Sequence, residues 1–95
     1  MTFPDTTPPT QPTKLALTPA TTSIALKWTT STDNVGVSGY RIYRGSTLIA
    51  TVKGNVTTYT STGLKVNTTY SYHLVAFDAA GNLSKASATV SAKTK

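Results

Sequence analysis

The 95-residue sequence contains no cysteine and no glutamate, and it has one histidine and three acidic residues. Without cysteine, neither a disulfide framework nor a thiolate metal site is available. The lone His73 cannot build a zinc site without other ligands. Catalysis by general acid and base needs a positioned pair of groups, and the only carboxylates are Asp5, Asp33 and Asp78. We therefore predict a protein that is not an enzyme and that holds no cofactor.

Long hydrophobic runs are also missing. No segment approaches the roughly 18 apolar residues that a membrane-spanning helix needs, and the N-terminus shows no basic-then-apolar signal segment. A chain of 95 residues is enough for one domain core and too short for two. The sequence predicts one domain with no membrane partner, and we expect it to be a monomer.

The net charge is +6, from nine basic residues against three acidic ones. The lysines and arginines are scattered along the chain, and no basic patch is interleaved with aromatic residues. We interpret them as a solvated basic surface and predict no nucleic-acid partner. Weak attraction to an anionic cell wall or to nucleic acid is the alternative.

Threonine is abundant, and apolar residues alternate with polar ones in short runs. The clearest run holds Ile24, Leu26 and Trp28 on one face, a period of two that is typical of a half-buried strand. Its phase places the single tryptophan in the core, where we expect the indole N–H to find a nearby acceptor. A longer run, 69–78, places Tyr70 and Tyr72 inward.

Seven short strands separated by turn residues predict an all-β, immunoglobulin-like sandwich. The expected strands are residues 14–18, 23–30, 40–44, 48–52, 56–60, 69–78 and 86–93, with Ala88, Val90 and Ala92 inward in the last. Residues 1–12 contain four prolines among threonines and are predicted to be the remnant of a stiff interdomain linker. The folded domain is then expected over residues 13–95.

Three features over about residues 8–94 make the chain resemble a fibronectin type III domain. Trp28 on the second strand is followed by Tyr40 at the start of the third, and residues 76–84 resemble the end of the family's sixth strand. Residues 64–70, from Leu64 to Tyr70, are similar to the family's tyrosine corner. The resemblance implies that the Tyr70 hydroxyl bonds to the backbone near Leu64, and that Trp28, Tyr40, Leu64 and Tyr70 have structural roles.

Residues 31–40 and 76–84 resemble a subset of that family, found in secreted bacterial polysaccharide-degrading enzymes such as chitinases and cellulases. The resemblance implies a secreted, non-catalytic spacer module that positions catalytic and carbohydrate-binding domains of the same polypeptide. Two alternatives remain open. One is a module that itself binds or loosens insoluble polysaccharide, and the other is a module that docks on its own catalytic domain.

Three outward residues, Tyr43, Val75 and Phe77, are the candidate surface contacts. We expect them to stand near one another on neighbouring strands, with Arg41 and His73 at the margin. Such a row can stabilise the sheet by cross-strand packing, dock a neighbouring domain, or stack on sugar rings.

The loops that carry Asp33 and Asp78 are expected to meet at one pole of the sandwich, near Asp5. There the carboxylates could hold a weakly bound cation with carbonyl groups of Asn34 or Asn82. The alternative is that each aspartate caps the backbone of its own turn.

Overall fold

The computed structural model describes residues 8–33 and 36–95, which contain seven strands and no helix. The strands are β1 (Thr13–Pro19), β2 (Ile24–Thr29), β3 (Val37–Arg44), β4 (Thr47–Lys53), β5 (Thr58–Ser61), β6 (Thr69–Asp78) and β7 (Val90–Lys93). No helix in this part of the chain is long and apolar enough to cross a membrane.

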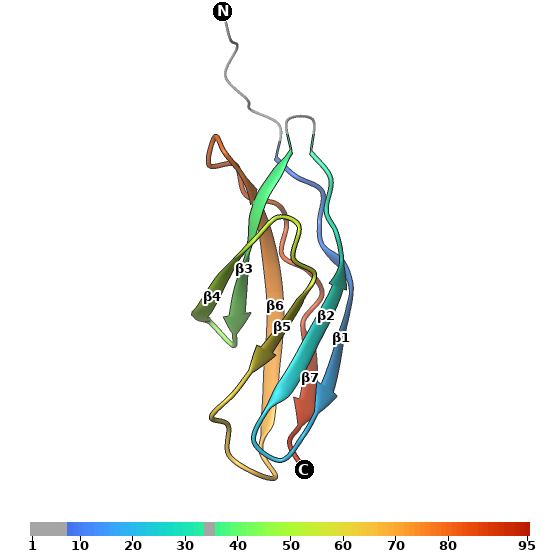
Figure 1. Cartoon of the computed structure of the whole chain (residues 1–95), viewed down its shortest axis with the longest axis vertical. Coiled ribbons are helices and arrows are strands. Elements are labelled where there is room, and N and C mark those ends of the chain that lie inside the picture. Colours follow the sequence, from blue (N-terminus) through green and yellow to red (C-terminus); the bar gives the residue numbers. More distant parts are fainter. Residues whose placement is uncertain (1–7, 34–35) are drawn as a thin grey trace, which may run out of the picture.

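The strands form two antiparallel sheets that pack face to face (Figure 1). One has three strands in the order β1-β2-β5, and the other has four in the order β4-β3-β6-β7. The predicted all-β sandwich is confirmed. The predicted bounds of β6 are also confirmed, and buried and half-buried residues alternate along it from Ser71 to Asp78.

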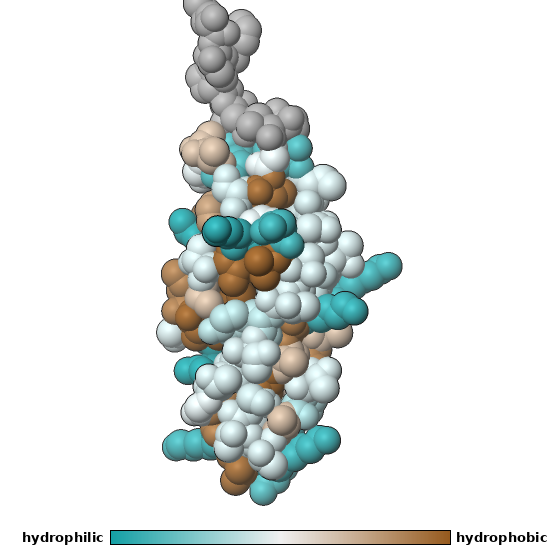
Figure 2. Space-filling view, in the orientation of Figure 1, coloured by the Kyte–Doolittle hydropathy of each residue, from teal (hydrophilic) through white to brown (hydrophobic). Residues whose placement is uncertain are grey.

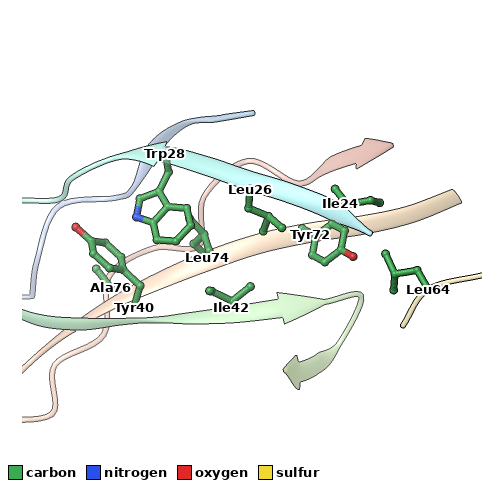
Figure 3. Close-up of a cluster of buried hydrophobic side chains, with 9 residues drawn as sticks. All are labelled: Ile24, Leu26, Trp28, Tyr40, Ile42, Leu64, Tyr72, Leu74 and Ala76. Atoms are coloured by element: carbon green, nitrogen blue, oxygen red, sulfur yellow. The ribbon is translucent and has the colours of Figure 1, made fainter. Parts of the chain in front are cut away.

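The core lies between the sheets and is built by the alternation seen in the sequence (Figure 3). Ile24, Leu26 and Trp28 point inward from β2, while the intervening residues are exposed. The Trp28 ring meets the Tyr40 ring edge to face, with centroids 5.5 Å apart. The inward residues of β3 and β6, Tyr40, Ile42, Tyr72, Leu74 and Ala76, are fully buried opposite them. Burial of these side chains is the main force that holds the sheets together.

The expectation that the Trp28 N–H finds an acceptor is wrong. Trp28 is 3% exposed, and its Nε1 has no hydrogen-bond partner among the described residues. The indole ring packs against the Tyr40 ring, so van der Waals packing rather than hydrogen bonding fixes its position.

The last strand is shorter than expected, because only Val90–Lys93 is a strand and Ala88 is exposed instead of inward. Two buried serines replace the missing strand. The N–H groups of Ser84 and Ser87 donate to the carbonyls of Ala76 and Leu74 at 2.8 Å. Their hydroxyls accept from the N–H groups of the same two β6 residues, also at 2.8 Å. Three residues of this segment therefore oppose two of β6, which breaks the two-residue alternation.

The tyrosine corner is confirmed. The Lys65 N–H donates to the Tyr70 hydroxyl at 3.0 Å, and the adjacent Leu64 is buried against the core. This bond ties the loop before β6 to the start of that strand.

Replacing each of two tyrosines of β6 by phenylalanine should affect the free energy of unfolding differently. Tyr70→Phe removes the acceptor of the Lys65 N–H and should lower the free energy of unfolding by about 1 kcal/mol. The Tyr72 hydroxyl is buried without a partner among the described residues. Tyr72→Phe should therefore leave stability unchanged or raise it by up to about 1 kcal/mol. Urea unfolding of both variants measures this; equal losses would contradict it.

Candidate functional site

The face of the four-stranded sheet that points away from the core carries the candidate contact residues, and we call it the outer face. Its cross-strand pairs follow from the register of β3 with β6. Tyr43 pairs with His73, Arg41 with Val75, and Gly39 with Phe77. The candidates Tyr43 and Phe77 thus lie at opposite ends of a row, with Arg41 and Val75 between them.

The aromatic rings of this row pack against neighbouring residues of the same sheet. The rings of Tyr43 and His73 are stacked, with centroids 4.8 Å apart and an interplanar angle of 3°. The Phe77 ring lies over Gly39, where a Cβ added to the glycine would come within 2.7 Å of the ring. The Arg41 guanidinium lies 5.5 Å from the Phe77 centroid. Arg41 therefore lies within the row, not at its margin as expected, whereas His73 lies at the Tyr43 end of the row.

This arrangement leaves little aromatic surface for a sugar. A sugar ring stacks on the open face of an aromatic side chain. One face of Tyr43 is covered by His73, and Phe77 lies between the backbone of Gly39 and the guanidinium of Arg41. All four of these side chains are only partly exposed. The geometry favours packing within the sheet over sugar stacking.

Asp78 caps the turn after β6. Its Oδ1 accepts from the N–H groups of Ala80 and Asn82 at 3.0 and 2.9 Å, and its Oδ2 accepts from Asn82 Nδ2 at 2.9 Å. Gly81 completes this turn with φ of 89°, a backbone conformation that glycine adopts without steric cost. The carboxylate is buried and turned toward its own backbone.

Asp33 has the same kind of role, because its Oδ2 accepts from the Gly36 N–H at 3.2 Å. The turn-capping interpretation of both aspartates is thus confirmed. No group of three metal-ligating side chains occurs among the described residues. Asp5 and Asn34, which the cation hypothesis includes, lie outside those residues.

A shallow groove lies between the start of β1 and the segment before β7. Its lining is formed by Gln11, Pro12, Thr13, Lys14, Leu15, Ser87, Ala88 and Val90. The lining contains no carboxylate and no histidine, so this groove offers no acid–base pair.

The chain enters the sandwich through a fixed segment. Pro9 and Pro12 are buried, and Thr10 exchanges hydrogen bonds with Thr32 through its N–H (2.8 Å) and its Oγ1 (2.9 Å). Gln11 Nε2 donates to the Ala86 carbonyl at 2.7 Å. Part of the predicted linker therefore packs on the sandwich, while the boundary at residue 12 stays a prediction.

The chain leaves at the other end, where it is fixed just as firmly. Thr94 is buried, its N–H donates to the Thr68 carbonyl at 3.0 Å, and its Oγ1 accepts from the Thr68 N–H at 2.9 Å. The Lys95 N–H donates to the Ala20 carbonyl at 2.8 Å. The hydrogen bonds of Thr10 and Thr94 that fix the two ends of the domain were not predicted, because a single threonine in a threonine-rich sequence gives no signal of its own.

Comparison with known proteins agrees with this geometry. The model of the fibronectin type III domain family matches residues 8–93. The chain is 56% identical over 91 residues to chitinase A1 of Niallia circulans, which covers 95% of this chain and 13% of that protein. It is 47% identical over 95 residues to exoglucanase B of Cellulomonas fimi, covering 99% of this chain and 8% of that protein.

Among solved structures, the chitinase ChiA74 from Bacillus thuringiensis superposes with a TM-score of 0.85 at 35% identity, covering 100% of this chain and 15% of that one. The chain thus spans only a small part of the length of the proteins it matches. Together with the sandwich topology and the tyrosine corner, the match over residues 8–93 shows that the chain belongs to the fibronectin type III family.

Proposed function

We propose that the chain is a non-catalytic accessory module of a secreted bacterial glycoside hydrolase of the chitinase type, where it sets the distance between a catalytic and a carbohydrate-binding domain. The observation that carries this proposal is the placement of the two chain ends. The chain enters beside Thr32, just beyond the end of β2, and leaves beside Ala20, just before its start (Figure 1). Neighbouring domains would therefore attach at opposite poles.

The size of the module suits this role. Ala20 lies across a tight turn from Ser23, so the nine steps from Ser23 to Thr32, at about 3.3 Å each, separate the poles by about 30 Å. Hydrogen bonds at both ends fix the direction in which the chain enters and leaves. A rigid spacer of this length keeps a tethered catalytic domain at high effective concentration near an insoluble surface. The names of the relatives, a chitinase and an exoglucanase, support this substrate class.

Replacing the module in its hydrolase tests this role. Residues 8–95 would be exchanged for a flexible glycine–serine linker of about 30 residues, whose root-mean-square span is also about 30 Å. We expect hydrolysis of insoluble chitin or cellulose to fall by about twofold to tenfold, because reach is kept while direction is lost. Hydrolysis of a soluble oligosaccharide, which needs no positioning, is the control and should not change. Equal rates on the insoluble substrate would rule out the spacer role.

Direct binding of polysaccharide is the competing function, and a sedimentation assay separates the two. The isolated chain, mixed with insoluble chitin and cellulose, should stay in the supernatant, because His73 covers one face of Tyr43 and the Arg41 guanidinium lies over the Phe77 ring. Depletion that disappears at high salt would reflect only the net charge of +6. Depletion that resists salt and is lost in the Tyr43→Ala/Phe77→Ala variant would establish binding through the outer face.

A further inference from the structure

The outer face carries exposed apolar side chains at two of its edges. Leu48, which pairs with Tyr43 at the β4 edge, is 48% exposed. Leu83, which forms a bridge with Phe77 beyond β6, is 47% exposed. Only Val66 is a further exposed large hydrophobic residue among those described. In Figure 2, which views the sandwich with β2 and β5 in front, the surface over these two strands is mostly pale, whereas apolar residues show beside them over β4. Two of the three exposed large hydrophobic residues among those described thus lie at the edges of the outer face.

The same face is positively charged. Arg41, Lys53 and Lys93 project from β3, β4 and β7, as their pairing with Val75, Gly39 and Thr69 shows. The described carboxylates, Asp33 and Asp78, are engaged in turns outside this face. Covering these cations without opposite charges would be costly, so a partner must bring carboxylates. A second copy of this chain would oppose cations to cations, and a neutral polysaccharide would supply no counter-charge.

The area of the outer face suits a tethered partner. Four strands about 4.8 Å apart, and about 20 Å from Ser71 to Phe77, give a face on the order of 400 Å². A partner that covered it would bury about 800 Å² in total, less than the roughly 1,200 Å² typical of independent complexes. The same area lies within the range of about 600 to 1,500 Å² seen between domains of one chain.

From these observations we infer that the outer face docks an acidic, partly apolar surface of a neighbouring domain in the same polypeptide. The inference rests on the proposed accessory function and adds the partner and its chemistry. Apolar contact with Leu48 and Leu83 supplies the attraction, and carboxylates facing Arg41, Lys53 and Lys93 supply the orientation.

Thiol labelling in the hydrolase that carries the module tests the docking. The module has no cysteine, so Thr51→Cys provides a single exposed thiol on the outer face, and Thr58→Cys a control on the opposite sheet. Maleimide should modify Cys at position 51 about fivefold more slowly in the hydrolase than in the isolated chain, the ratio expected if about 80% of molecules are docked. The control position should react at the same rate in both. Equal rates at position 51 would overturn the inference.

Charge reversal identifies the chemistry of the partner. Lys53→Glu with Lys93→Glu should abolish the protection of position 51, whereas Lys27→Glu with Lys65→Glu, an equal change of net charge elsewhere, should leave it intact. Equal loss in both pairs would show a non-specific charge effect and overturn the inference. Protection of position 51 in the isolated chain by added chitin or cellulose would assign the face to polysaccharide and also overturn it. Protection in the hydrolase with unchanged hydrolysis in the linker experiment would uphold docking while refuting the spacer role.

Discussion

Gly54→Ala should destabilise the module by about 3 kcal/mol or more, one of the largest losses that a single methyl group can cause in this chain. A Cβ at position 54 would lie 2.0 Å from the carbonyl oxygen of Val37 and 2.8 Å from its carbonyl carbon. Both atoms belong to the backbone of β3, so no side-chain rotation relieves the clash. The Gly54 N–H also donates to the Ser38 carbonyl at 3.0 Å, and separating the strands would break this bond.

The control for this variant is Gly63→Ala. Gly63 has φ of 70°, and a Cβ added there would meet nothing within 4 Å, so the substitution introduces conformational strain without a clash. That strain should cost about 1 to 2 kcal/mol. Urea unfolding followed by far-ultraviolet circular dichroism measures both. If Gly54→Ala costs no more than Gly63→Ala, the close approach of residue 54 to β3 does not exist in solution.

The close contact between Gly54 and β3 could not be predicted from the sequence. The sequence indicates a turn at residues 53–55, which is where β4 ends. It gives no sign that the turn touches the start of β3, because that contact depends on how the two strands lie in space. The Ser84 and Ser87 bonds to β6 escape prediction for the same reason: a hydroxyl that replaces a strand carbonyl leaves no period in the sequence.

The alternation of β2 and β6 was predictable, because one face of each strand is buried and the period of two records it. It also predicted which residues occupy the outer face. It could not predict their order across the face, which depends on the register between strands. The uninterrupted pairing of β3 with β6 from Gly39 to Arg44 sets Tyr43 opposite His73 and Phe77 opposite Gly39. The irregularity at Ile42/Tyr43 against β4 sets Tyr43 opposite Leu48.

Trp28 is the position where loss of a side chain should most nearly unfold the module. Trp28→Ala removes the largest buried ring and the partner of Tyr40, and such truncations cost about 3 to 5 kcal/mol. Small domains have a total stability of about 5 to 15 kcal/mol, so much of the margin disappears. We expect a large drop in the urea concentration at the midpoint of unfolding. Unfolding should be monitored by circular dichroism, because the variant has lost the only tryptophan.

Trp28→Phe separates packing from hydrogen bonding at the same site. Phenylalanine keeps an aromatic edge for Tyr40 and removes the Nε1–H, which has no acceptor among the described residues. Removing an unsatisfied buried donor offsets part of the lost packing, so Phe should cost less than half of what Ala costs. A loss for Phe as large as that for Ala would mean that the indole N–H is hydrogen-bonded in solution, and that the ring is held by more than its shape.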